Sequence, residues 1–202
     1  MEAFSHIEER LSSRKIVVAG VDEAGRGPLA GPVVSAAVVW DYSFFNPDIR
    51  DSKKLSEKMR ALLFDYIRTN ATSIGVAIVS PQEIDRLNIR NASLLAMRKA
   101  VERLPVSPGM VLVDGRDPIP TLSIKQEPII SGDDKIFAIS AASIVAKVTR
   151  DRIMLRYDKE YPGYGFASHK GYPTKKHKEA IRRLGPSPIH RKTFHGVASF
   201  IL

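Results

Sequence analysis

The sequence predicts an α/β domain in which helices flank a mixed central β-sheet, with a helical appendage at the C-terminal end. The first observation is a pair of β-branched runs, residues 16–21 and 32–40, joined by a glycine-rich loop. This pattern predicts an antiparallel hairpin. The second is that apolar strands at residues 73–79 and 110–113 alternate with helical patterns. A hairpin followed by strand–helix alternation indicates a sheet with both antiparallel and parallel pairs.

The helices are predicted from periodicity and from capping residues. A helix is expected over residues 56–67, where Ser56 can cap the first turn. Ser80, Pro81 and Glu83 form a capping box with proline at the first helical position, so a helix should begin there and continue to Pro105. Longer and shorter helices are expected at residues 137–159 and 174–184, and a weaker strand at 121–124.

Composition excludes several classes of protein. The chain has 202 residues, 44% of them hydrophobic, which is enough for one folded unit with a real core. It contains no cysteine, so disulfides and thiolate chemistry are excluded, in keeping with a reducing compartment. No apolar run approaches the length of a membrane span, and the first residues do not form a secretion signal. We therefore expect a cytoplasmic monomer that does not bind membranes.

The positive charge is segregated along the chain. The net charge is +9, and the first 144 residues carry 18 basic and 18 acidic side chains. Residues 145–195 carry 13 basic and 4 acidic side chains, so all of the excess lies there. Such segregation is typical of a surface that binds a polyanion, and it favours nucleic acid over membrane because no amphipathic anchor is present. We expect residues 1–160 to form the catalytic domain and residues 161–202 a basic helical segment packed on it.

Three acidic residues follow apolar strands. Asp22 and Glu23 come after the first strand and Asp114 after the strand at 110–113, so they converge if those strands are neighbours. Each alone is typical of a turn or a helix cap. Together they repel one another, which a fold tolerates only with protons or cations between them. Oxygen ligands without His or Cys favour two Mg²⁺ or Mn²⁺ ions, an arrangement suited to phosphodiester hydrolysis. Asp133, before the long helix, supplies a fourth acid or caps that helix.

Six motifs resemble the ribonuclease HII family, the bacterial type 2 ribonucleases H. They occur in the family's order and extend over most of the chain, from about residue 16 to 194. The stretches are residues 21–34 (VDEAGRGPLAGPVV), 51–56 (DSKKLS), 112–115 (LVDG), 132–133 (GD), 140–147 (SAASIVAK) and 169–172 (HKGY).

The resemblance implies a ribonuclease H-like fold and a metal-dependent endoribonuclease. Its expected substrates are the RNA strand of RNA/DNA hybrids and single ribonucleotides embedded in duplex DNA, cleaved on their 5′ side to leave 3′-hydroxyl and 5′-phosphate ends. The residues that match the family's metal-binding and catalytic acids are Asp22, Glu23, Asp114 and Asp133. Asp134 is adjacent and remains an alternative to Asp133.

The remaining motifs are candidates for substrate binding. Backbone groups of Gly25, Arg26 and Gly27 can approach a 2′-hydroxyl closely because two of these positions lack a Cβ atom. Tyr172 resembles the family tyrosine that stacks on the sugar after the ribonucleotide, although a core-capping role is the alternative. Candidates for phosphate contacts are Lys53, Lys54, Ser143, Lys147 and Lys170, and for any single lysine a solvated surface position is the alternative.

Other classes of protein make different predictions. The histidines at positions 169, 177, 190 and 195 show no metal-ligand spacing, so packing or phosphate contact is expected of them. A nucleotide-dependent oxidoreductase would require a helix directly after Gly31, where a strand is predicted. The alternative from the binding class is a non-catalytic, basic RNA-binding protein whose acids are structural.

Overall fold

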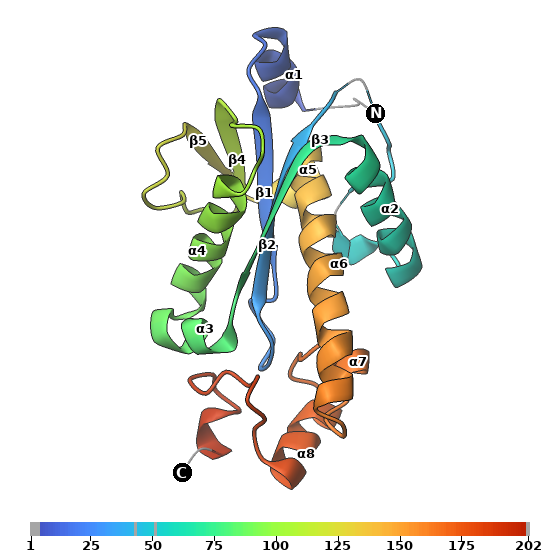
Figure 1. The fold of residues 1–202 in the computed structure, drawn as a ribbon, viewed down its shortest axis with the longest axis vertical. Coiled ribbons are helices and arrows are strands. Elements are labelled where there is room, and N and C mark those ends of the chain that lie inside the picture. Colours follow the sequence, from blue (N-terminus) through green and yellow to red (C-terminus); the bar gives the residue numbers. More distant parts are fainter. Residues whose placement is uncertain (1–4, 43, 51, 201–202) are drawn as a thin grey trace.

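The computed structural model describes residues 5–42, 44–50 and 52–200. A five-stranded sheet in the order β3-β2-β1-β4-β5 forms its centre (Figure 1). The strands are β1 (Val18–Ala24), β2 (Val33–Trp40), β3 (Ala71–Val79), β4 (Met110–Asp114) and β5 (Gln126–Ile129). β1 pairs antiparallel with β2 and parallel with β4, so the predicted hairpin and the mixed sheet are confirmed.

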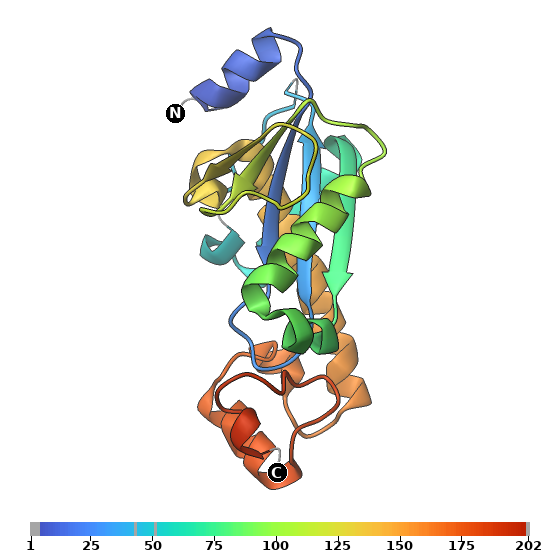
Figure 2. The same cartoon turned by 90° about the vertical axis from the view of Figure 1, so that its left-hand side faces the viewer.

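Helices cover both faces of the sheet and one end of it (Figures 1 and 2). They are α1 (His6–Ser13), α2 (Glu57–Asn70), α3 (Pro81–Leu87), α4 (Ile89–Glu102), α5 (Gly132–Lys135), α6 (Phe137–Glu160), α7 (Phe166–His169) and α8 (Lys175–Leu184). Two short 3₁₀ helices, η1 (Ser52–Lys54) and η2 (Ala198–Phe200), are also present. No helix among the described residues is long and apolar enough to cross a membrane.

The helices α6 and α4 pack on opposite faces of the sheet. On one face, α6 and α2 bury side chains against Ala36 and Val38 of β2, and on the other, α4 packs against Ala37 and Val39 of the same strand. α6 approaches β1 most closely at Gly20, where a Cβ atom would lie 2.2 Å from the backbone carbon of Ala138. A larger residue at position 20 would therefore push the helix away from the central strand.

Two predicted elements are wrong. The helix expected from Ser80 to Pro105 is divided at Asn88, whose φ of 65° ends α3 and whose side chain caps α4. The strand expected at residues 121–124 is a loop, and β5 follows it. The side chain of Gln126 accepts a hydrogen bond from the Ile119 N–H (2.6 Å) and donates one to its carbonyl (2.9 Å), so this loop satisfies its backbone through a side chain.

An N-terminal helix, which periodicity did not predict, supports the long central helix. The carboxylate of Glu8 in α1 is fully buried and accepts hydrogen bonds from the N–H groups of Phe137 (3.1 Å) and Ala138 (3.0 Å). These are orphan donors at the start of α6, which has no side-chain cap of its own. A negative group at this position also complements the helix dipole.

The C-terminal segment packs on the loop between β1 and β2, residues 25–32, which we call the glycine-rich loop. Ala30 lies in a cluster with Phe166 and Ile189, and Leu29 in another with Ile181. The appendage therefore covers the end of the sheet (Figure 2). The division into units at residue 160 stays a prediction.

Three histidines lie together inside this segment. His177 and His190 are almost fully buried, and their Nε2 atoms are 3.1 Å apart. The ring of His169 stacks on that of His177 at 4.3 Å between centroids. The expectation of packing is confirmed for these rings. Burial lowers the pKa of His177 and of His190 to about 4, so both are neutral at pH 7.

These pKa values predict loss of stability on acidification. Between about pH 6.5, the ordinary histidine pKa, and pH 4 the unfolded chain binds protons that the folded chain does not, so the free energy of unfolding falls as pH falls. Urea titrations at pH 7, 6 and 5 measure the free energy of unfolding of the wild type and of a His177→Asn/His190→Asn variant. The stability advantage of the wild type should become smaller as the pH is lowered. Comparing the two proteins cancels the titration of the carboxylates, and a pH-independent difference would contradict the expectation.

Candidate active site

Two buried arginines hold the glycine-rich loop. Arg191 donates to the carbonyls of Arg26 (2.9 Å), Gly25 (2.6 Å) and Gly31 (3.0 Å). Arg150 of α6 donates to those of Ala30 (3.1 Å) and Pro32 (3.0 Å). Their exposed fractions are 0% and 1%. Burial lowers the pKa of Arg191 to about 9 and that of Arg150 to about 10, so both remain charged at pH 7.

The loop depends on glycine where it passes these arginines. Gly25 has a φ of 104°, and a Cβ atom there would lie 2.2 Å from Nε of Arg150 and 2.8 Å from the carbonyl oxygen of Pro32. Gly27 faces the cleft instead, and a Cβ atom there would lie 3.7 Å from Cε1 of Tyr172. The loop and the tyrosine ring therefore stand opposite each other.

Strand pairing brings the predicted acids together. The parallel register pairs Val21 with Val113, so Asp22 and Asp114 occupy the next position on neighbouring strands. Both acids, and Glu23, lie within the last residues of their strands and not after them as the sequence suggested. Asp133 of α5 joins them because the N–H of Gly132 donates to Oδ1 of Asp114 (2.7 Å).

The acids raise one another's pKa. Burial, followed by the charges of Glu23 and Asp114, holds the pKa of Asp22 well above its usual range. Burial also raises the pKa of Glu23, with the charge of Asp114 adding and that of Arg26 opposing. The pKa of Asp114 is raised by burial and by the charge of Asp133. Ionising this cluster thus costs free energy that a cation would recover.

Two side-chain cations partly balance these acids. Nζ of Lys53 lies 2.8 Å from Oδ2 of Asp133, and Nη1 of Arg26 lies 3.4 Å from Oε1 of Glu23. Oε2 of Glu23 is buried without a hydrogen-bond partner among the described residues. Within residues 5–42, 44–50 and 52–200, no three His, Asp or Glu side chains are placed to hold one metal ion as they stand. The carboxylate oxygens, including the unpaired one of Glu23, are nevertheless the ligands that hard divalent cations prefer. A change of side-chain rotamer would direct them at one ion.

A cleft of about 220 Å³ joins the acids, the loop and the tyrosine. Ten of the predicted residues line it: Asp22, Glu23, Gly25, Arg26, Gly27, Lys53, Asp114, Ser143, Lys147 and Tyr172. Asp133 reaches the cleft through its contact with Lys53. Strands β1 and β4, helix α6, the 3₁₀ helix η1 and two loops thus contribute to one hollow.

The comparisons with known proteins agree with this geometry. The family model described as Ribonuclease HII matches residues 19–197. The chain belongs to the ribonuclease HII family. A ribonuclease HII from Syntrophotalea carbinolica is 50% identical over 97% of this chain and 94% of its own length.

Solved structures show the same fold. The crystal structure of the ribonuclease H2 from Pyrococcus horikoshii matches with a TM-score of 0.76 and 30% identity, covering 91% of this chain and 96% of that one. The ribonuclease HII in a complex with PCNA from Archaeoglobus fulgidus matches with a TM-score of 0.75 and 26% identity, covering 89% and 96%. Ribonuclease H-like architecture is thus confirmed, and membership of the ribonuclease HII family makes the chain a metal-dependent ribonuclease H.

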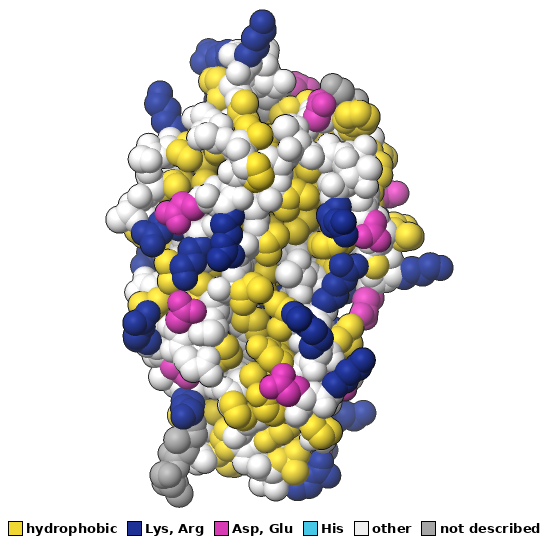
Figure 3. Space-filling model, viewed as in Figure 1, with side chains coloured by type: hydrophobic (Ala, Val, Ile, Leu, Met, Phe, Trp, Pro, Cys, Tyr) yellow, Lys and Arg dark blue, Asp and Glu magenta, His cyan; other side chains and the backbone are white. Residues whose placement is uncertain are grey.

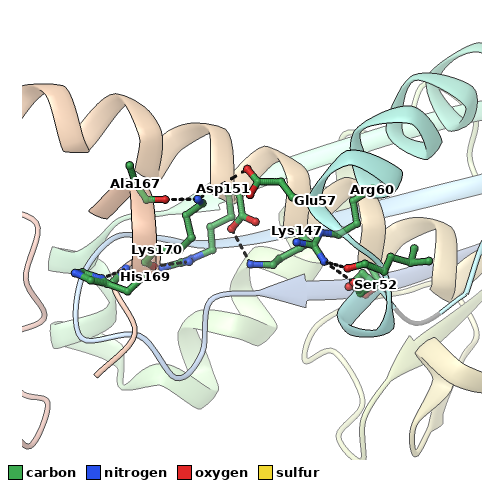
Figure 4. A network of polar contacts seen from close by, with 12 residues as sticks. Ser52, Glu57, Arg60, Lys147, Asp151, Ala167, His169 and Lys170 are labelled. Carbon is green, nitrogen blue, oxygen red and sulfur yellow. Dashed lines mark hydrogen bonds and ion pairs between the residues drawn. The ribbon is translucent and has the colours of Figure 1, made fainter. Parts of the chain in front are cut away.

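The other predicted lysines lie differently with respect to the cleft. Lys147 lines it, but its Nζ atom is 2.7 Å from Oδ1 of Asp151, one helical turn further along α6 (Figure 4). The side chain of Lys170 turns away, donating to the carbonyl of Ala167 and approaching Glu57 (Figure 4). The side chain of Lys54 lies outside the described residues.

Sequence reasoning missed the residues that support this ribonuclease HII site. Ser52 lines the cleft, and its hydroxyl is 2.9 Å from that of Ser143. Arg150 and Arg191 were counted only as part of the basic segment. One signal was available for Arg150, because it lies four residues from both Ala146 and Met154 and thus on the face of α6 that they bury. Arg191 offered no such pattern.

Removing one acid should stabilise the metal-free protein. Asp22→Asn removes a buried charge repelled by Glu23 and Asp114, so at pH 8 we expect the melting temperature to rise by about 2–4 °C, the equivalent of ~1 kcal/mol for a chain of this size. Saturating Mn²⁺ should raise the melting temperature of the wild type more than that of the variant. Differential scanning fluorimetry with and without EDTA measures both, and Asp65→Asn on the exposed face of α2 is the control. A lower melting temperature for metal-free Asp22→Asn would contradict the repulsion.

Proposed function

We propose that this chain is an endoribonuclease that cleaves the RNA strand of RNA/DNA hybrids and cleaves on the 5′ side of single ribonucleotides in duplex DNA. The products are a 3′-hydroxyl and a 5′-phosphate. The observation that supports it is that Asp22, Glu23 and Asp114, with Asp133 beside them, converge on one cleft that the glycine-rich loop and Tyr172 also line. Because one chain lines the whole cleft, we propose that the monomer is active.

The four acids would hold two divalent ions, Mg²⁺ or Mn²⁺. When bound, such ions supply a nucleophilic water and charge for the leaving oxygen. Asp22 and Asp114 are fixed on paired strands, so they provide rigid ligands. Glu23 and Asp133 exchange their side-chain cations for the metals. The ion pair of Lys53 with Asp133 is screened by solvent, since the side chain of Lys53 is 76% exposed.

The cleft also offers a way to recognise a ribonucleotide. Only the 2′-hydroxyl distinguishes RNA from DNA at one nucleotide. Backbone groups of residues 25–27 would bond it, while the ring of Tyr172, 42% exposed, packs on the following sugar. Since Gly27 and this ring face each other, the two contacts act on adjacent nucleotides. A deoxyribonucleotide leaves the hydrogen bonds of the loop unmade and is disfavoured.

Phosphate contacts would come from lysines around this cleft. Lys53, Lys147 and Ser143 line it, and we propose that they contact phosphates together with Lys54 and Lys170. The binding-only alternative, in which the acids are structural, is less well supported. Structural carboxylates are paired and have lowered pKa values, whereas Asp22 and Asp114 have raised ones.

The acids are tested by cleavage. Asp22→Asn and Asp114→Asn should each lower the cleavage rate of a duplex with one embedded ribonucleotide by at least about 100-fold, because each removes a negative ligand without changing side-chain size. Binding of the duplex, measured by fluorescence anisotropy, should persist. The assay runs with Mg²⁺ or Mn²⁺ and with EDTA, and all-DNA and all-RNA duplexes serve as substrates that should not be cleaved. Asp65→Asn should retain wild-type rates; full activity in both site variants would refute the proposal.

The basic C-terminal segment should supply affinity that depends on salt. Figure 3 shows Lys and Arg side chains on both flanks of one face, with Asp and Glu side chains dispersed among them. Converting the exposed Lys175, Lys176 and Lys178 of α8 to Gln should flatten the slope of log Kd against log salt by about 0.9 for each phosphate that is no longer neutralised. The matched control removes three charges at the opposite end of the molecule, from Arg10, Arg14 and Lys15. Equal slopes for the two triple variants would place the phosphate-binding side chains elsewhere.

A further inference from the structure

The backbone of Tyr172 is held at both of its polar groups. Its N–H donates to the carbonyl of His169 (2.9 Å) at the end of α7. Its carbonyl accepts from the N–H of Thr174 (2.8 Å) and from Nδ1 of His177 in α8 (2.9 Å). The ring itself extends into the cleft opposite Gly27. The direction of the ring is therefore set by backbone contacts that lie behind it, inside the C-terminal segment.

The contact from His177 is the end of a chain of directed hydrogen bonds. The N–H of Ser187 donates to Nδ1 of His190 (2.9 Å), so this nitrogen carries no proton and Nε2 does. Nε2 of His190 then donates to Nε2 of His177 (3.1 Å). Nδ1 of His177 consequently carries the proton that is donated to Tyr172. Each ring is neutral, and the partner of its other nitrogen selects its tautomer.

Neighbouring contacts fix the rest of the turn. The stacked ring of His169 accepts from the N–H of Gly171 (3.1 Å), the residue before Tyr172. The carbonyl of Gly171 accepts from the N–H of Leu29 (2.8 Å) in the glycine-rich loop. Arg150, which holds that loop, also donates to the carbonyl of Lys170 (3.0 Å). The backbone of the turn is thus attached to the glycine-rich loop as far as Gly171. The next carbonyl group, that of Tyr172, is held by the first residues of α8 and its cap.

We propose that His177, oriented by His190 and Ser187, is a positioning residue that sets the distance between the Tyr172 ring and the glycine-rich loop and thereby the preference for an RNA–DNA junction over a continuous hybrid. The inference rests on the proposed function, in which loop and ring read adjacent nucleotides. An apolar side chain could fill the same volume. It could not direct a hydrogen bond at the Tyr172 carbonyl, and the peptide would be held there by Thr174 alone.

Two isosteric variants separate positioning from packing. In His177→Asn the side-chain amide lies where Nδ1 was, so it can still donate to Tyr172 but no longer reaches His190. In His177→Gln the amide reaches the position of Nε2, so it keeps His190 but no longer bonds Tyr172. Each variant removes one imidazole and one hydrogen bond from the same site. Both should therefore have similar melting temperatures, below that of the wild type. The assays are run below both melting temperatures.

The measured quantity is the ratio of two cleavage rates with Mn²⁺, that of a duplex with one ribonucleotide divided by that of a continuous RNA/DNA hybrid. We expect His177→Gln to lower this ratio about five-fold, the factor equivalent to one neutral hydrogen bond, and His177→Asn to leave it within about two-fold. Equal ratios in the two variants, whether lowered or not, would show that His177 only fills the core. A larger loss in His177→Asn would also overturn the proposal.

Two further measurements complete the test. Tyr172→Ala should lower the ratio at least as far as His177→Gln does. If it leaves the ratio unchanged, the proposed junction reading fails and the inference fails with it; if it lowers the ratio while the His177 variants behave alike, the inference alone fails. Nitrogen-15 NMR of the imidazoles in the wild type reports tautomers without any substitution. His177 should be protonated at Nδ1 and His190 at Nε2, and the opposite assignment for His177 would refute the mechanism.

Discussion

The cleft depends on two guanidinium groups buried behind the glycine-rich loop. Arg150 and Arg191 come from segments more than a hundred residues beyond this loop in the chain, yet both donate hydrogen bonds to its carbonyls, and Arg150 also donates to the carbonyl of Lys170. Burying such charges is costly, and several charge-assisted hydrogen bonds offset the cost. These bonds fix the loop backbone, so the protein itself positions the groups that the loop presents to the cleft. The C-terminal segment is thus part of the site and more than a basic surface.

Next to this loop, the fold holds a cluster of acidic side chains that its own cations neutralise only in part. Asp22 and Asp114 cannot move apart, because each belongs to a strand paired in register at the centre of the sheet. Burial raises the pKa of both, and neighbouring charges add to it, those of Glu23 and Asp114 for Asp22 and that of Asp133 for Asp114. Lys53 and Arg26 reduce the repulsion without forming a closed, buried network, since both side chains are largely exposed. Such a site gains most from a bound cation, which agrees with the metal dependence of the family.

Local signals predicted the elements well where the determinants are local. Ser56 and the capping box at Ser80 mark real helix starts, and the Val-rich runs form the central hairpin. The errors arose where a single side chain overrode periodicity. Asn88 takes a left-handed conformation and begins a new helix, although the apolar spacing continues past it. Gln126 bonds the Ile119 backbone and keeps the preceding segment out of the sheet. Neither effect is visible in a hydrophobic pattern.

The sequence by itself determined the fold class, the family and ten of the residues that line the cleft, because motifs such as residues 21–34 carry the chemistry in contiguous stretches. The tertiary structure alone decided how these stretches are held. The register of β1 on β4 sets the spacing of the acids, Arg150 and Arg191 hold the loop, and His177, which is bonded to His190, reaches the Tyr172 carbonyl. The partners of the acids and of the loop lie far away in the chain, and the energies of all these contacts depend on burial and direction. A residue's type and its place in the sequence specify neither.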